Sequence, residues 1–240
     1  KIMAQNQFKN LGEILDYVNY ELGQDLSGHY ISPEDLTLIG NEVQVEYFND
    51  QVNMFEVNRE VSSNMIPFTK TAGDDVNPPI YINEYGKADF PADCVYNVRA
   101  NYFQYLNKGC STSAKYKQIV FTPQDFYGGA MNMPMMNPLT NPKEVPAYAV
   151  IESGQLKVVP NVGQFSMTYL RLPDSINFDY EEIGGEPVYL PPGTYNSLGV
   201  LSTSKEFEWR PDVLPILASR ILEKAAINIR SSFNIQTNKQ

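Results

Sequence analysis

Ten prolines lie between residues 67 and 160, and they limit this part of the chain to short elements. A proline inside a helix removes one hydrogen bond and clashes with the preceding turn, so long helices are excluded here. Short runs rich in Val, Ile, Tyr and Phe separate the prolines, which is typical of β-strands. We therefore predict five strands, over residues 80–83, 116–121, 147–152, 156–159 and 164–172.

Two further segments of this region need separate predictions. Ser153-Gly154 stands between two of the predicted strands and is typical of a tight hairpin turn. Residues 91–106 suit a helix at Val95, Val98 and Tyr102, while their neighbours suit a strand. We predict weakly helical structure for residues 91–106.

The ends of the chain have helical patterns. Apolar residues recur at spacings of three and four from Phe8 to Leu22. Ser32-Pro33-Glu34-Asp35 is a helix start signal, because serine can cap the helix and proline needs no amide partner there. The apolar pattern of this second helix continues to about Val57. A closing helix follows residues 210–215, with both prolines of that segment in its first turn.

These elements predict an α+β fold. An N-terminal helical hairpin and a C-terminal helix are expected to pack together, with a central antiparallel β-rich region. The expected domains are residues 1–60 for the hairpin, 61–208 for the β-rich region with long Pro- and Met-rich loops, and 209–240 for the closing helix and tail. With 42 % hydrophobic residues the chain can bury a core, and it has neither an apolar run of ~18 residues nor a secretory signal. We expect a soluble protein that does not interact with membranes.

The net charge of −10 is unevenly distributed along the chain. Residues 1–93 hold 16 acids and 5 bases, whereas residues 94–240 hold 12 acids and 13 bases. This balance argues against a dedicated nucleic-acid binder, which needs a basic surface. It favours head-to-tail stacking, in which the acidic helical end of one molecule meets Lys or Arg of another. Solubilising a helix pair is the alternative role for each acid.

The residue types that usually carry catalysis are scarce. Cys94 and Cys110 are the only thiols, and their wide spacing fits no paired-cysteine zinc site; we favour buried free thiols, with a disulfide as the alternative. His29 is the only histidine and is expected to be a loop side chain. The pairs Asp74-Asp75 and Glu181-Glu182 are poor acid–base dyads, because adjacent strand residues point to opposite faces. We predict no enzyme activity and no catalytic, cofactor-binding or metal-binding residues.

Residues 128–138 combine glycines, prolines and half of the eight methionines, which predicts a loop. Flexible thioethers fill irregular apolar recesses, so we expect this loop to pack on a neighbouring subunit or on a second protein. The alternative is a loop that folds back onto its own domain. The candidate residues for subunit contacts are Met131, Met133, Met135, Met136, Arg220, Lys224 and Arg230.

Several short motifs resemble a known family when taken in order along the chain. They are Ser32-Pro33-Glu34, Phe90-Pro91-Ala92-Asp93, Asn141-Pro142 to Pro146, Leu156 to Pro160, Met167 to Pro173, and Phe207-Glu208-Trp209 before the closing helix. This order resembles virion proteins of tailed bacteriophages, and it is most similar to head-to-tail connector or collar ring (adaptor) proteins of crAss-like phages. The similarity covers most of the chain.

The resemblance implies a structural protein of the virion. It implies a homo-oligomeric ring of twelve copies at the head-to-tail interface, in contact with the portal and with neighbouring collar or tail rings. Such a ring is assembled in the host cytoplasm and surrounds double-stranded DNA that passes through without sequence-specific binding. An acidic channel wall would repel phosphate, so we hypothesise that acids of the second helix line or flank the lumen. The candidates are Glu42, Glu46, Asp50 and Glu56.

Two alternative functions remain open. A β-rich carbohydrate- or receptor-binding module would need tyrosines clustered on one exposed groove. A hydrolase would need a cleft that contains His29 or paired carboxylates.

Overall fold

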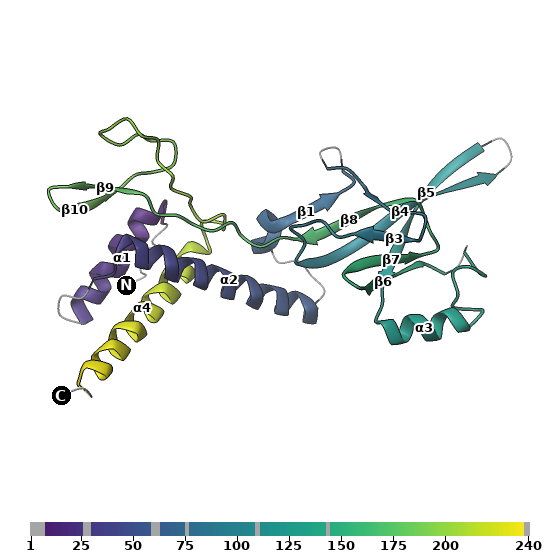
Figure 1. Ribbon diagram of the computed structural model, residues 1–240, viewed down its shortest axis with the longest axis horizontal. Helices are drawn as coiled ribbons and strands as arrows, with labels where there is room; N and C mark the ends of the chain where they lie inside the picture. Colours follow the sequence, from purple (N-terminus) through teal and green to yellow (C-terminus); the bar gives the residue numbers. More distant parts are fainter. Residues whose placement is uncertain are drawn as a thin grey trace, which may run out of the picture. The chain divides into compact units, whose positions relative to one another are not determined.

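The computed structural model describes residues 8–25, 30–58, 63–74, 77–108, 111–142 and 145–237. The chain divides into two compact units (Figure 1). Unit 1 combines residues 1–67 with residues 173–240, and unit 2 consists of residues 68–172. The domain boundaries expected at residues 60 and 208 stay predictions. No helix among the described residues has both the length and the apolar character needed to cross a membrane.

The described part of unit 1 has three α-helices, each beginning close to a predicted start: α1 (Leu11–Asp25), α2 (Pro33–Asn58) and α4 (Leu214–Thr237). Asn10 caps α1, because its Oδ1 accepts the Glu13 N–H at 2.9 Å. Ser32 caps α2 in the predicted way: its Oγ accepts the Asp35 N–H at 3.1 Å. These caps satisfy backbone donors that the first helical turn leaves open. The prediction of two N-terminal helices is confirmed.

The closing helix differs from the prediction at its start. Only Pro215 lies in the first turn of α4, whereas Pro211 belongs to the preceding turn at residues 211–213. The backbone N–H of Ile216 bonds to Val213 O, so the chain already coils before the helix begins.

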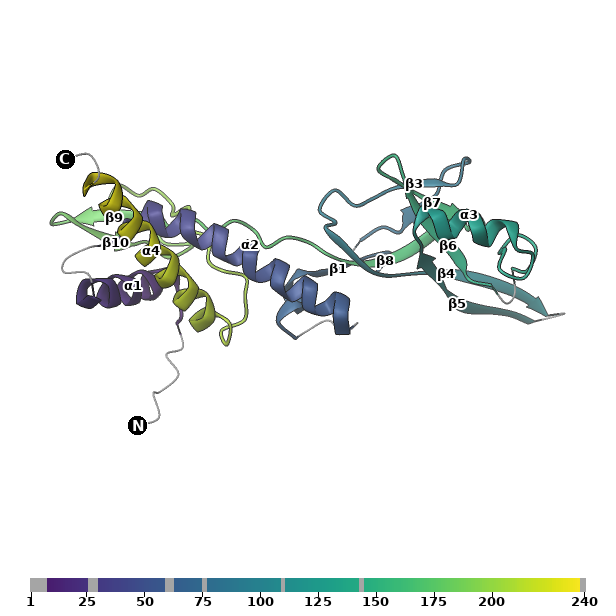
Figure 2. The same ribbon diagram turned by 90° about the horizontal axis from the view of Figure 1, so that it is seen from below.

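The core of unit 1 forms where α4 packs against both α1 and α2 (Figures 1 and 2). Each helix contributes apolar side chains at spacings of three and four, so each buries one stripe. The fully buried side chains include Leu11, Ile14, Leu22, Leu36, Phe48 and Leu217.

A strap of extended chain, residues 174–178, runs along α2 within unit 1 and is held to it by hydrogen bonds. Asn41 holds it through both backbone groups of Ile176: Oδ1 accepts the N–H at 2.8 Å, and Nδ2 donates to the carbonyl at 3.0 Å. Buried Gln44 donates to Asp174 O at 3.0 Å. A Cβ at position 40 would lie 2.6 Å from Cδ1 of Ile176, so Gly40 lets the strap approach the helix this closely.

Unit 2 is a curled, mixed β-sheet, visible at the right of Figure 1. The strand order is β1-β8-β4-β5-β6-β7-β3, and β2 also pairs with β8. The 3-10 helix η1 (Ser63–Phe68) precedes the first strand. The strands are β1 (Thr69–Ala72), β2 (Ile80–Tyr81), β3 (Lys87–Asp89), β4 (Tyr96–Lys108), β5 (Ser111–Phe121), β6 (Ala147–Glu152), β7 (Gln155–Val159) and β8 (Gln164–Leu170).

The expected purely antiparallel arrangement is wrong at one strand pair. β5 and β6 are parallel, with Ile119 opposite Ala147, whereas the other paired strands of the sheet are antiparallel. Helix α3 (Gln124–Asn132) and the loop after it carry the chain back to the level of Ile119, so β6 starts beside the last residues of β5 and runs in the same direction. Parallel neighbouring strands need a long crossover of this kind, and the sequence pattern did not predict one.

Two other local predictions for unit 2 are wrong. Residues 96–108 form strand β4 instead of weakly helical structure, because Ala100 and Asn101 pair with both β5 and β8 and the residues after them pair with β5. Residues 128–132 belong to α3 although the glycines there predicted a loop. Pairing partners distant in sequence decide strand formation more strongly than local spacing does.

The hairpin and the predicted strands around it are confirmed. Ser153 and Gly154 have φ values of 55° and 80°, which is the geometry of a two-residue turn between β6 and β7. The inner face of the curled sheet buries small and large side chains in alternation. Its members include Ala100, Ile119, Ala147, Ala149, Leu156, Phe165 and Met167.

Candidate functional site

Two sets of charged residues that the sequence assigned to different sites meet within unit 1. Lys224 Nζ on α4 lies 2.9 Å from Glu42 Oε1 and 2.7 Å from Glu46 Oε1 on α2. One turn earlier on α4, Arg220 Nη1 lies 2.8 Å from Asp50 Oδ2. Acids spaced by four residues on one helix therefore face bases spaced by four on the other. We call these five residues the α2–α4 ladder.

The ladder is partly exposed and keeps a negative charge. Burial lowers the pKa of Lys224, but hydrogen bonds and charges from Glu46 and Glu42 outweigh it, so its pKa lies above the ordinary value. Three carboxylates face two cations, which leaves one uncompensated negative charge. Exposed ion pairs of this kind each contribute about 0–1 kcal/mol. The ladder therefore joins two helices and still presents acidic groups to solvent.

The structure thus brings together five of the predicted site residues inside one chain. The side chains of the other two charged candidates, Glu56 and Arg230, lie outside the described residues. The roles of these residues toward a neighbouring subunit or a channel stay predictions.

The ladder continues into an aromatic stack. The Arg220 guanidinium lies 5.1 Å from the ring centroid of Tyr47, and the rings of Tyr47 and Trp209 are 4.9 Å apart at 72°. Edge-to-face geometry of this kind is favoured by the ring quadrupoles. The stack connects α2, α4 and the chain that leads into α4.

The four methionine candidates have different surroundings. Met136 packs on a cluster of unit 2 that includes Ala130, Val145 and Tyr148, so this side chain folds back onto its own unit. Met131 is half-buried, whereas Met133 and Met135 are exposed. Only part of the methionine set is therefore presented to solvent.

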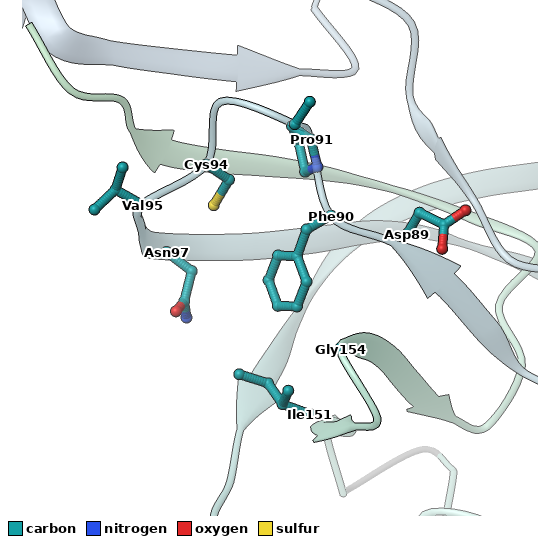
Figure 3. Close-up of a pocket in the computed structure, with 9 residues that line it drawn as sticks. Asp89, Phe90, Pro91, Cys94, Val95, Asn97, Ile151 and Gly154 are labelled. Atoms are coloured by element: carbon teal, nitrogen blue, oxygen red, sulfur yellow. The ribbon is translucent and has the colours of Figure 1, made fainter.

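A pocket of about 500 Å³ lies between the β3–β4 connection and the β6–β7 turn (Figure 3). The Phe90 ring and Cys94 Sγ enter it from one side and Ile151 from the other, while the Asp89 carboxylate points away from the thiol. Burial, followed by the charge of Asp93, raises the pKa of Cys94 to about 11. A thiol with this pKa is protonated at neutral pH and is a weak nucleophile.

Other chemical candidates from the sequence lie outside the described residues: His29, Asp75 and Cys110. Within the described segments, no group of three or more His, Cys, Asp or Glu side chains is placed to hold a metal ion.

Residues 180–203 form an arm on unit 1 that the sequence analysis did not identify. It consists of the hairpin β9 (Tyr180–Ile183) and β10 (Glu186–Tyr189), followed by a loop; both project from the helices in Figure 1. The arm leaves many apolar side chains exposed to solvent. They are Ile183, Val188, Tyr195, Leu198, Val200 and Leu201.

Polar contacts hold the loop of the arm in one conformation. Glu181 accepts hydrogen bonds from the N–H and the hydroxyl of Ser197. Asn196 Oδ1 accepts the N–H groups of Leu198 at 3.0 Å and Val200 at 2.8 Å. Asn side chains commonly stabilise turns in this way. The apolar side chains are therefore displayed on a frame that is already formed.

The available sequence signal for the arm was a set of apolar residues between two turn motifs. Gly184-Gly185 and Pro191-Pro192-Gly193 bracket β10, and apolar residues occur on both sides of the second motif. Such residues read equally well as strand interiors, so exposure could not be inferred from them.

Glu206 anchors the base of the arm to α1. One carboxylate oxygen accepts the Leu11 N–H at 2.9 Å, and the other accepts the Tyr189 hydroxyl. Burial raises the pKa of Glu206, and the two hydrogen bonds lower it by less than burial raises it. Burial also raises the pKa of Tyr189, and the hydrogen bond that its hydroxyl donates to Glu206 raises it further.

We expect the stability of the wild type relative to Glu206→Gln to fall as pH rises. The folded-state pKa of Glu206 lies above its ordinary value of 4.5. The stabilisation by the protonated carboxyl is therefore complete below pH 4.5 and disappears as the pH rises past the raised pKa. The glutamine of the variant can still accept from Leu11 and donate to the oxygen of Tyr189, without titrating. Urea unfolding of both proteins between pH 4 and pH 8 measures the difference. A difference that grows with pH would contradict the expectation.

Comparison with protein-family models and with curated proteins finds no match to this chain.

Proposed function

We propose that this chain is a structural virion protein that forms a homo-oligomeric ring in the head-to-tail assembly of a tailed phage. The supporting observation is the arm, which displays six large apolar side chains on a hydrogen-bonded frame. Soluble monomers rarely expose apolar residues in such a concentration, and contiguous exposed patches mark interaction sites. In this role the protein works by contact with its own copies and does not transform a substrate.

The charge distribution supports contacts between unlike surfaces. Unit 1 holds 20 acids and 9 bases, a net charge of −11, and unit 2 holds 8 acids and 9 bases, a net charge of +1. A cyclic ring joins one face of each subunit to a different face of the next. A contact between unit 1 and unit 2 of successive copies avoids bringing two strongly acidic surfaces together.

In the proposed ring, exposed acids of unit 1 face a central channel for genome ejection. Glu42, Glu46 and Asp50 keep half or more of their side-chain surface exposed despite their ion pairs. A wall of this charge repels phosphate and lets DNA slide. The proposed ring has twelve copies, contacts the portal and neighbouring collar or tail rings, and is assembled in the host cytoplasm. A hairpin of α1 and α2 with α4 forms its helical layer.

Native mass spectrometry of the purified protein, alone and with its portal, tests this proposal. We expect species near twelve times 27.1 kDa. A protein that stays at the monomer mass at every concentration, both alone and with the portal, would contradict the ring.

Exposed tyrosines of unit 2 favour a second candidate function, a carbohydrate- or receptor-binding module. Tyr81, Tyr85 and Tyr116 all have exposed rings, which can stack on sugars. Binding on a glycan array that is lost when all three are replaced by alanine would favour this function over the ring.

A further inference from the structure

Leu198 is the tip of the loop in the arm. Its side chain is 85 % exposed although its backbone N–H is bound by Asn196. The Ser197 bonds to Glu181 fix the residue before it. Because the loop is already ordered, a partner that binds it loses little free energy to fixing the loop backbone. The loop therefore has the properties of a preformed apolar knob.

Unit 2 carries a recess that suits such a knob. A pocket of about 270 Å³ is lined by Tyr102, Val162 and Phe165, with Pro79 and Tyr116 also at its wall. Gly73 brings the adjoining loop close to β8, since a Cβ there would lie 2.9 Å from Cβ of Ser166. This volume accommodates a leucine side chain, and its lining combines aromatic and apolar side chains with the polar side chains of Asn101, Gln164 and Ser166. Small-ligand sites combine apolar walls with a few polar groups in the same way.

The charges near the two surfaces are complementary. Within the described part of the chain, Glu182 and Glu186 of the arm form no ion pair. Arg99 lies two residues before Asn101 of the pocket, on the same face of β4, and its described contact is a 3.4 Å hydrogen bond to the Thr168 hydroxyl. An acidic arm is thus attracted to the side of unit 2 that carries this cation.

We infer that Leu198 of one copy inserts into this pocket on unit 2 of the next copy, with the acids of the arm facing Arg99. The inference rests on the proposed ring and names the contact that closes it. Because knob and pocket are on different units, each copy offers both halves of the contact. Repetition of such a heterologous contact closes a ring when the rotation between successive copies divides a full turn evenly.

The first experiment compares Leu198→Asp with Leu38→Asp by native mass spectrometry. Leu38 is a matched control on α2, because it is 71 % exposed and lies outside the arm. We expect Leu198→Asp to weaken subunit association at least tenfold, and Leu38→Asp to leave it within twofold of the wild type. Circular dichroism verifies that each variant is folded. A wild-type ring that Leu198→Asp leaves intact overturns the inference and not the ring, whereas a monomeric wild type overturns the proposed function itself.

The second experiment tests the pocket. Arg99→Glu should weaken association, and combining it with Glu182→Arg and Glu186→Arg should recover most of the loss. A photocrosslinking residue at position 198 should label peptides of a second copy that contain Tyr102, Tyr116 or Phe165. Crosslinks to any other surface, or a charge swap that restores nothing, overturn the inference.

Discussion

Replacement of Trp209 by alanine should lower the free energy of unfolding by about 3–5 kcal/mol, as is usual when a buried Trp is truncated. Trp209 is 4 % exposed and its ring meets the edge of Tyr47 at 4.9 Å between centroids. Loss of the indole leaves a cavity beside Tyr47, whose ring also packs against the Arg220 guanidinium. The variant should therefore loosen α2, α4 and the segment between Phe207 and Leu214 together.

Urea unfolding followed by far-ultraviolet circular dichroism measures this effect, because the substitution removes the only tryptophan. Tyr20→Ala is the matched control, since Tyr20 is an aromatic residue of α1 that is 64 % exposed. The control should change stability by less than about 0.5 kcal/mol. Trp209→Phe keeps a ring against Tyr47 and should cost clearly less than the alanine variant. Equal midpoints for Trp209→Ala and Tyr20→Ala would refute a structural role for the stack.

Helix positions were the most predictable part of this fold. Their information is local: apolar spacing from Phe8 to Leu22, and the cap at Ser32, lie within a few residues of the structure that they determine. The hairpin at Ser153-Gly154 was predictable for the same reason, since only a few residue types adopt its positive φ values. Local chemistry of this kind does not depend on the rest of the chain.

Strand β4 and the parallel pairing of β6 were not predictable, because both depend on distant partners. Tyr102 lies opposite Lys117, and Ala100 lies between Ile119 and Met167. Once these contacts exist, they outweigh the helical spacing of residues 91–106. The direction of β6 depends on α3, whose adjacent glycines Gly128 and Gly129 are poor helix formers.

The candidate site shows the same limit. Sequence analysis selected Glu42, Glu46, Asp50, Arg220 and Lys224, and the structure pairs all five with one another. About 170 residues separate the two sides of the ladder, so no spacing rule could join them. The arm was missed although its residues lie close together in the sequence. Its apolar residues resemble core residues in sequence, and only the fold leaves them exposed.

Replacement of Asn41 by alanine should lower the free energy of unfolding by about 2–3 kcal/mol. Asn41 satisfies both backbone groups of Ile176 and accepts a hydrogen bond from buried Gln44 at 2.9 Å. Alanine removes this partner from both backbone groups of Ile176, and buried polar groups that lose a partner retain their full cost of desolvation. The loss should be largest where the strap crosses α2, so amide hydrogen exchange at residues 174–178 should accelerate in Asn41→Ala.

Asn53→Ala and Asn41→Asp separate this role from a general effect on α2. Asn53 is an exposed residue of the same helix, and its replacement should change stability by less than about 0.5 kcal/mol. An aspartate at position 41 can still accept the Ile176 N–H, but it can donate to the Ile176 carbonyl only when protonated. The folded-state pKa of this aspartate should therefore be raised, so Asn41→Asp should gain stability as pH falls from 7 to 4, relative to Asn41→Ala. Parallel pH profiles of these two variants, measured by urea unfolding, would mean that the strap does not depend on a hydrogen bond donated from position 41.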